Sequence, residues 1–234
     1  MKRTTDPIDE GVAGGAPSVI VWDLSIRLFH WGLVGLIAFS WWSAENDHVQ
    51  WHMWSGYAVI TLLLFRLLWG IVGGSTARFS SFVRGPRAVA AHLRDPGAWR
   101  DAGHNPLGGL SVLALLGVLA AQVGLGLILT DEDGTNQGPL ANLVSFDISE
   151  AARELHETCF TLLQILILLH VAAIAYYRVF KGKRLVGPMI TGRAIVDSEA
   201  VPVRPAKWWL ALICLAIALA VTRWIVAGAP PFGG

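Results

Sequence analysis

The chain has 234 residues, of which 54% are hydrophobic and 15% are charged, and its formal net charge at pH 7 is +1. A mean hydropathy of +0.53 and 11 tryptophans are typical of a membrane protein, in which tryptophan gathers at the membrane–water interfaces. This composition leaves little room for a soluble domain, and we expect membrane lipid, and no nucleic acid, among the partners of the chain.

Five apolar segments are each long enough to cross a hydrocarbon core about 30 Å thick. In chain order they cover residues 25–44, 51–73, 107–130, 155–179 and 208–227. The sequence therefore predicts an all-α fold, a transmembrane helical bundle with a four-helix core and a fifth C-terminal transmembrane helix. We expect residues 1–19 to be a flexible cytoplasmic tail, 20–195 to be the four-helix domain, and 196–234 to be a linker followed by the fifth helix.

Three of these spans carry histidines at two different depths. His30 lies near the start of the first span, and His52 lies near the start of the second, at the opposite membrane surface. His156 and His170 are fourteen residues apart in the fourth span. At 100° and 1.5 Å per residue, fourteen residues return to within about 40° of the same face over a rise of roughly 21 Å. His30 with His170, and His52 with His156, are therefore two pairs at two depths.

Each pair offers two axial nitrogens, which is what one six-coordinate heme iron requires. We therefore predict two hemes b, with His30, His52, His156 and His170 as the metal ligands. A single histidine in a span is more often a hydrogen-bonded interior residue, but ionisable groups inside a membrane are costly, and four at matched depths favour a cofactor. Zinc would need three or four ligands around one ion, which the fourteen-residue spacing forbids for His156 and His170. The chain has no CxxCH motif, so a covalently attached c-type heme is not indicated.

Basic residues near the membrane boundaries are candidates for binding heme propionates. The candidates are Arg27, Arg66, Arg153 and Arg178. Arg27 and Arg153 each lie one turn before a predicted ligand, and the other two lie near the cytoplasmic ends of their helices. The alternative for each is that the side chain snorkels to lipid phosphates. Gly56, four residues after His52, would leave room for a flat macrocycle against the backbone.

The remaining histidines have weaker claims as ligands. His48 precedes His52 by four residues but lies among acidic residues in a short connection, so we expect it to be exposed. His104 precedes Asn105 and Pro106, which look like an N-cap followed by proline at the first helical position. Its place near the cytoplasmic interface also makes it a candidate for a quinone site. His92, in a basic amphipathic stretch, is expected on the surface.

The connections between spans differ in charge. Of the 18 basic residues, 12 lie between the second and third spans or between the last turn of the fourth span and the start of the fifth, whereas the other two connections are acidic. By the positive-inside rule, the N-terminus is expected in the cytoplasm and the C-terminus outside.

Several segments together resemble the bacterial cytochrome b561 family, especially the branch that includes the b-type subunit of nickel-iron hydrogenases. They are RLFHWG with His30, HMWSG with His52, RLLWGIVG, DAGHNP, and LHE followed by a second histidine fourteen residues on. The resemblance covers roughly residues 20–195. It implies a multi-pass protein of the bacterial inner membrane, with two b hemes stacked across the bilayer at the four histidines and a quinone site near the cytoplasmic heme.

These features predict a diheme b-type cytochrome that transfers electrons between the quinone pool and a periplasmic redox partner, such as a cytochrome c or a dehydrogenase subunit. Quinone is then a substrate, and whether the chain has quinone oxidoreductase activity of its own stays open. The alternatives are a membrane anchor subunit of a hydrogenase-type or other dehydrogenase complex, a superoxide:quinone oxidoreductase, and a non-redox structural membrane protein. Five acidic residues in the third connection argue against superoxide, because that anion requires positive potential at the outer surface.

Overall fold

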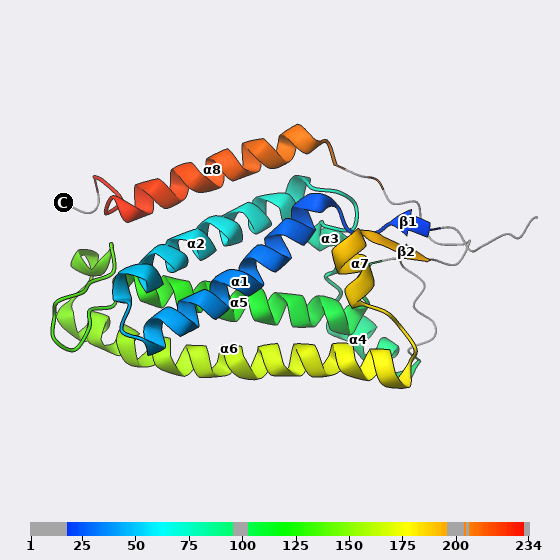
Figure 1. The fold of residues 1–234 in the computed structure, drawn as a ribbon, viewed down its shortest axis with the longest axis horizontal. Coiled ribbons are helices and arrows are strands. Elements are labelled where there is room, and N and C mark those ends of the chain that lie inside the picture. The colour runs from blue at the N-terminus through cyan, green and yellow to red at the C-terminus, as the bar shows by residue number, and fades with distance from the viewer. Residues whose placement is uncertain (1–17, 96–102, 196–203, 205, 232–234) are drawn as a thin grey trace, which may run out of the picture.

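The computed structural model describes residues 18–95, 103–195, 204 and 206–231. Among these residues, five helices are long and apolar enough to cross a membrane, and they run up and down one bundle (Figure 1). They are α1 (Leu24–Glu45), α2 (Val49–Val72), α5 (Pro106–Ile128), α6 (Phe146–Phe180) and α8 (Trp208–Val226). The fold is therefore an all-α transmembrane bundle, as predicted.

Most of the shorter elements lie at one end of the bundle (Figure 1). They are β1 (Ser18–Ile20), α3 (Phe79–Phe82), α4 (Pro86–Arg94), α7 (Val186–Thr191) and β2 (Arg193–Ile195), while the 3-10 helix η2 (Ala141–Leu143) lies at the other end. We call the first end, where α1 begins, the His30 end. The opposite end, where α1 turns into α2, is the His52 end.

Side-chain caps fix where three of the long helices begin. Asp23, Asn105 and Ser145 each accept a hydrogen bond from the backbone N–H three residues later, at 2.8, 2.7 and 3.4 Å. Such caps satisfy donors that have no partner within the helix. The Ser145 cap starts α6 at Phe146, nine residues before the predicted span, so the first turns of α6 extend beyond its apolar stretch.

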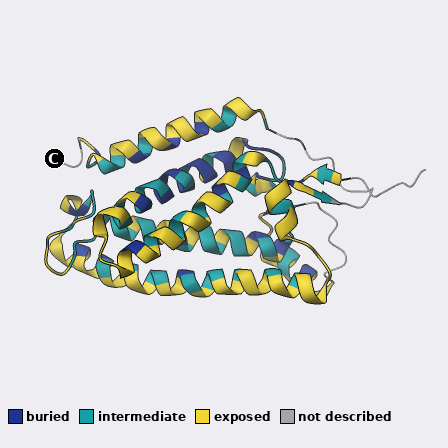
Figure 2. Ribbon diagram, viewed as in Figure 1, coloured by how far each residue is buried: buried dark blue, intermediate teal, exposed yellow. Residues whose placement is uncertain are grey.

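Two apolar clusters hold the helices together. One joins α1, α2 and α8 and includes Trp69 and Ala218. The other joins α2, α5 and α6 and includes Leu63, Leu119 and Leu163. Because α2 belongs to both clusters, half of its most apolar stretch is buried, against 6% for α6. Figure 2 shows the exposed outer faces of α6 and α8, whose apolar side chains are free to meet lipid.

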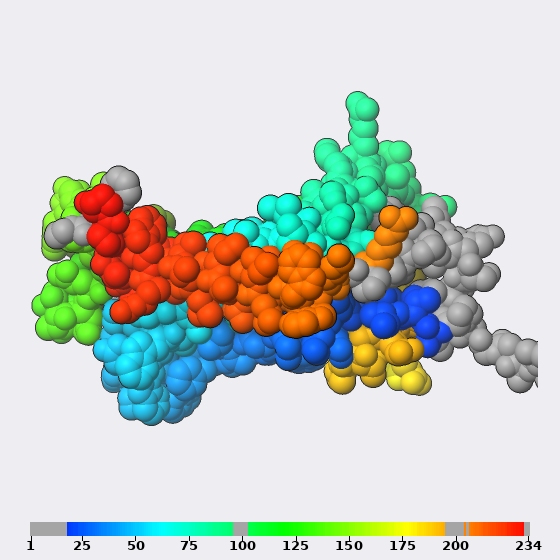
Figure 3. Space-filling view, turned by 90° about the horizontal axis from the view of Figure 1, so that it is seen from above, coloured from blue at the N-terminus to red at the C-terminus, as the bar shows by residue number. Residues whose placement is uncertain are grey.

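The fifth helix packs on α2 and lies along the outside of the molecule (Figure 3). Ala218 is fully buried at this contact. The Thr61 hydroxyl donates a hydrogen bond to the Thr222 hydroxyl at 3.0 Å, which links the two helices inside an apolar setting. The predicted fifth helix is thus present, and most of the predicted linker, residues 196–203 and 205, lies outside the described residues.

A two-stranded sheet joins the segment before α1 to the segment after α7. β1 and β2 are antiparallel, with Ser18 opposite Ile195 and Ile20 opposite Arg193. Gly192 precedes β2 with a φ of 81°, a left-handed conformation that glycine adopts without strain. The sheet uses two residues of the predicted tail, whose remainder lies outside the described residues.

The structure corrects the expectation for His92. This residue was expected on the surface, but only 7% of it is exposed. α4 is amphipathic and packs against α5, so one face of this basic helix turns inward and carries His92 with it.

Candidate heme site

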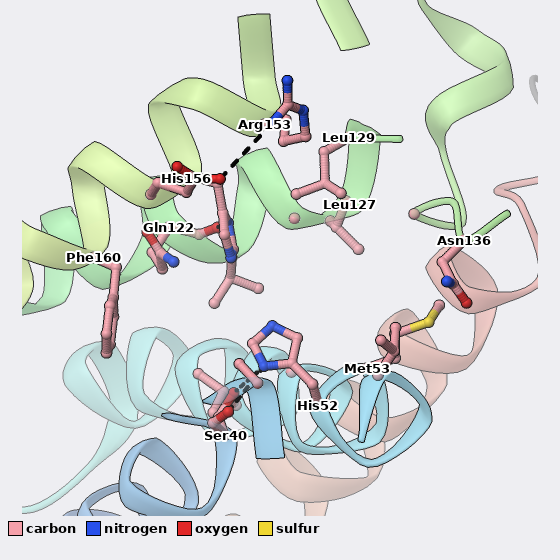
Figure 4. Close-up of a pocket in the computed structure, with 18 of the residues that line it drawn as sticks. Ser40, His52, Met53, Gln122, Leu127, Leu129, Asn136, Arg153, His156 and Phe160 are labelled. Carbon is pink, nitrogen blue, oxygen red and sulfur yellow. Dashed lines mark hydrogen bonds and ion pairs between the residues drawn. The ribbon is translucent and has the colours of Figure 1, made fainter. Parts of the chain in front are cut away.

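Two imidazoles from different helices face each other near the His52 end. His52 comes from the first turn of α2 and His156 from the part of α6 that lies beside it. Their ring centroids are 6.1 Å apart and their planes are inclined by 79°. Figure 4 shows both rings directed into the space between the two helices.

Backbone carbonyls orient both rings. His52 Nδ1 donates to the carbonyl oxygen of Ser40 at 2.9 Å, and His156 Nδ1 donates to the carbonyl oxygen of Gln122 at 2.9 Å. A neutral imidazole with its proton on Nδ1 has a free lone pair on Nε2. Metal-binding histidines commonly use this arrangement, because the carbonyl fixes both the tautomer and the ring orientation.

The rings open into a cavity of about 640 Å³. Apolar side chains of α1, α2, α5 and α6 form most of its wall, as expected for a site that holds a largely apolar cofactor. At Gly56 an added Cβ would meet nothing within 4 Å, so this stretch of the wall is open. At Gly126 an added Cβ would lie 3.2 Å from Cε1 of His156, so only glycine leaves this imidazole its full space. Among the described residues no three His, Cys, Asp or Glu side chains gather around one metal position. Two opposed lone pairs in an apolar cavity fit a heme.

Charged side chains form the rim of this cavity. Arg153 pairs with Glu132 at 2.9 Å and lies 3.9 Å from Glu157. The loop that carries Glu132 is held by Asp131, which accepts hydrogen bonds from the side chain and the backbone N–H of Asn136 at 2.7 and 3.0 Å. These hydrogen bonds hold the pKa of Asp131 below its ordinary value. The rim therefore combines one arginine with an excess of carboxylates.

A second pair of histidines lies toward the His30 end. His30 of α1 and His170 of α6 are close enough to interact electrostatically. Because His170 follows His156 by fourteen residues, the second pair lies roughly 21 Å along the bundle from the first. The Nδ1 atom of His30 is buried and has no hydrogen-bond partner among the described residues. An orphaned imidazole nitrogen inside a membrane bundle also fits a metal-bound cofactor.

Comparison with known protein families assigns the chain to one of them. Residues 21–192 match the family model described as prokaryotic cytochrome b561. The chain belongs to the prokaryotic cytochrome b561 family. Searches among curated proteins and among solved structures found no match. The family resemblance read from the sequence is therefore confirmed, and it indicates a b-type membrane cytochrome that binds heme and takes part in electron transfer.

The match to the cytochrome b561 family ends before α8. Two of the predicted propionate partners, Arg27 and Arg178, lie far from the cavity at the His52 end. Arg27 is hydrogen-bonded through Nη1 to the carbonyl oxygen of Ile190, which ties α1 to α7. Trp31, next to His30, donates to the carbonyl oxygen of Met189 at 3.1 Å. Arg178 is exposed in the last turn of α6. The structure thus places both arginines at the His30 end of the cytochrome.

The histidines outside the two pairs have distinct surroundings. His48 is exposed, as expected, and its ring lies 5.5 Å from that of Trp42 and 4.8 Å from that of Trp51. His104 lies one residue before the Asn105 cap of α5, and its buried Nδ1 has no hydrogen-bond partner within the described part of the chain. Burial, together with the nearby positive charges of Arg66 and His170, lowers the pKa of His104 to about 4. His104 is therefore neutral at physiological pH.

Sequence reasoning missed three residues of the site at the His52 end. Ser40 and Gln122 orient the imidazoles through their backbone carbonyls, which leave no mark in a sequence. Gln122 does carry a signal, because it is a buried amide in an otherwise apolar helix. Gly126 could have been suspected only from its distance to His156, which requires the fold.

Proposed function

We propose that this protein is a diheme b-type cytochrome that transfers electrons between membrane quinone and a redox partner at the opposite membrane surface. The observation that carries the proposal is the pair formed by His52 and His156, each with Nδ1 tied to a carbonyl and Nε2 left free beside an apolar cavity. Each heme, when bound, would supply a one-electron relay.

The four histidines would divide into the predicted pairs. His52 and His156 would hold one heme, and His30 and His170 the other. Two axial nitrogens for each iron leave no position for oxygen or substrate, which suits electron transfer. The spacing on α6 supports the scheme, because one helix then supplies a ligand to both hemes.

Other predicted residues would contribute at the two heme edges. Gly56 lines the open wall of the cavity at the His52 end, and Arg153 is the arginine on its rim, so we assign Arg153 to a propionate there. Arg27 and Arg178 lie at the His30 end, where they would serve the second heme's propionates or lipid phosphates.

The two ends of the cytochrome suit different partners. We place the His30 end at the cytoplasmic surface of the bacterial inner membrane and assign the quinone to it, because the basic connections lie at that end. The carboxylate-rich rim at the His52 end would then face the periplasm. Such a rim suits a basic electron-transfer protein, for example a cytochrome c. A dehydrogenase subunit is the other candidate, and its copurification with the chain would favour it.

The stoichiometry of heme tests the proposal. A pyridine hemochrome assay on the detergent-purified protein should give two b hemes per chain, with low-spin spectra in both oxidation states. His170→Ala should remove the heme at the His30 end and leave the other. Two hemes that both survive this substitution would contradict the pairing, and a wild-type chain without heme would contradict the proposed function altogether.

A further inference from the structure

A buried arginine repeats the heme spacing on α2. Arg66 follows His52 by fourteen residues, the same interval that separates His156 from His170 on α6. Arg66 therefore lies within about 40° of the face that carries His52, roughly 21 Å nearer the His30 end. α6 has a histidine at both depths, whereas α2 has a histidine at one depth and an arginine at the other.

Among the residues that the structure describes, no anion lies within bonding distance of Arg66. The arginine is 4% exposed, and its Nη1 atom has no hydrogen-bond partner among the described residues. Its guanidinium carbon lies 4.5 Å from the centre of the Phe79 ring and 5.9 Å from that of Phe82. A guanidinium stays charged, and an unpaired charge is strongly unfavourable when it is buried. Aromatic faces offset only part of this cost, so the site lacks an anion.

The acid that interacts with Arg66, Asp23, is already engaged. Asp23 interacts electrostatically with Arg66, but one of its carboxylate oxygens accepts from the backbone N–H of Ile26 at 2.8 Å and the other from Nε1 of Trp69 at 3.1 Å. These hydrogen bonds cap α1 and fix Trp69. Asp23 therefore reduces the field at Arg66 without supplying the missing hydrogen bonds.

His104 adds a second polar group with an open position. Its ring lies 4.9 Å from that of Phe82, which Arg66 also approaches, and 4.7 Å from that of Trp22. Its Nδ1 is buried and has no partner in the residues that the structure describes, and it interacts electrostatically with both Arg66 and His170. An imidazole nitrogen here can donate an N–H beside the Phe82 ring that Arg66 also approaches.

From this arrangement we infer that Arg66 and His104 together bind one carboxylate group of the heme held by His30 and His170. A planar guanidinium with several parallel N–H donors matches a carboxylate better than it matches a single carbonyl oxygen. The inference rests on the proposed function, since it requires a heme at the His30 end. It assigns His104 to the heme carboxylate and leaves the quinone reaction as an outcome of the test.

Redox titration of the full-length, heme-loaded protein gives the first test. Loss of the positive charge in Arg66→Gln should shift the reduction equilibrium of the heme at the His30 end about tenfold toward the oxidised form, or about 59 mV for one electron. Arg66→Lys should restore most of the shift, and His104→Gln should affect the same heme. Arg87→Gln, which removes an exposed arginine of α4, is the matched control and should change neither heme.

Methyl esters of the heme carboxylates distinguish carboxylate binding from a general effect of charge. In a His52→Ala background, titration with hemin reports the His30 end alone. Arg66→Gln should weaken hemin binding at least tenfold, and Arg66→Lys should weaken it less. Binding of hemin dimethyl ester should be the same with and without Arg66.

Three results would overturn the inference or its basis, and they can be told apart. Equal weakening of hemin and its ester in Arg66→Lys would assign Arg66 to packing. If Arg66→Gln left the heme potentials and the hemin affinity unchanged but slowed quinone reduction, the quinone would be assigned to Arg66 instead. A His52→Ala chain that binds no heme would contradict the proposed second heme itself.

Discussion

At the scale of single residues, the site depends on where carbonyls and glycines lie around two rings. His52 and His156 are held by carbonyl oxygens of neighbouring helices, so each proposed ligand is oriented by a helix other than its own. Gly126 completes this arrangement, because it lies one turn after Gln122 on α5 and leaves room for the His156 ring. A small change at Gly126 should therefore act directly on His156, the proposed heme ligand.

Gly126→Ala should weaken heme binding at the His52 end. The new Cβ would lie 3.2 Å from Cε1 of His156, so the ring must shift away from the carbonyl of Gln122. We expect a several-fold loss of that heme, or an altered low-spin spectrum, with the other heme unchanged. Gly124→Ala is the matched control, because its Cβ meets nothing within 4 Å and alanine favours a helix by about 1 kcal/mol. Equal effects of both substitutions would disprove a special role for Gly126.

His52 and His48 offer a second pair of matched substitutions. His52→Ala should remove one b heme per chain, because a heme with one axial ligand lost binds weakly. His48→Ala should leave both hemes in place, since His48 is exposed and packs on Trp42 and Trp51 instead of lining the cavity. Hemochrome assays of the two variants decide the matter. Loss of heme in the His48 variant would show that the helix register at the start of α2 was misjudged.

At the scale of helices, the sequence predicted the spans because apolar length alone defines them. The predicted span 25–44 differs from α1 by one residue at each end, and 208–227 differs from α8 by one residue at one end. α6 was predicted too short, because its first turns are polar and depend on the Ser145 cap. The β1 and β2 strands were missed, because three-residue strands are too short for an alternating pattern to show.

The same limit applied to the candidate site. The fourteen-residue spacing and the depths of the histidines were readable, since both follow from helix geometry. The hydrogen-bond partners of the two histidines were not readable. The carbonyls of Ser40 and Gln122 reach the imidazoles only because of the way α1, α2, α5 and α6 pack. The fourteen-residue interval from His52 to Arg66 was equally visible in the sequence. It could be interpreted only once the structure showed that Arg66 is buried.

The contact between α8 and α2 can be tested without touching the hemes. Ala218 is fully buried, so Ala218→Leu forces a larger side chain into a packed contact. Such overpacking lowers the free energy of unfolding by about 1–3 kcal/mol. We expect a lower midpoint of thermal unfolding and two hemes per chain before unfolding. Ala220→Leu is the matched control, because Ala220 is exposed on the same helix. Loss of heme in the Ala218 variant would mean that α8 supports the heme core itself.

At the scale of the whole molecule, five candidate spans among the described residues would put the two ends of the chain on opposite sides of the membrane. The connections at the His30 end are basic, and those at the His52 end are acidic, so the potential differs between the two surfaces. Electrons that cross the membrane would therefore leave or enter through surfaces of opposite sign. Under the proposed function, this asymmetry would decide which end could meet a soluble partner outside the cell.

Reporter fusions test the orientation that follows from this asymmetry. Alkaline phosphatase, which is active only outside the cytoplasm, should be active when fused after Gly234 or inserted near Gly134, and inactive when inserted near Gly182. Green fluorescent protein should give the reverse pattern, because Gly182 lies in the basic connection after α6. Fluorescence from a fusion at Gly234 would show that the topology is the reverse of the proposed one. The carboxylate rim at the His52 end would then face the cytoplasm, and a periplasmic basic partner would have no access to the heme behind it.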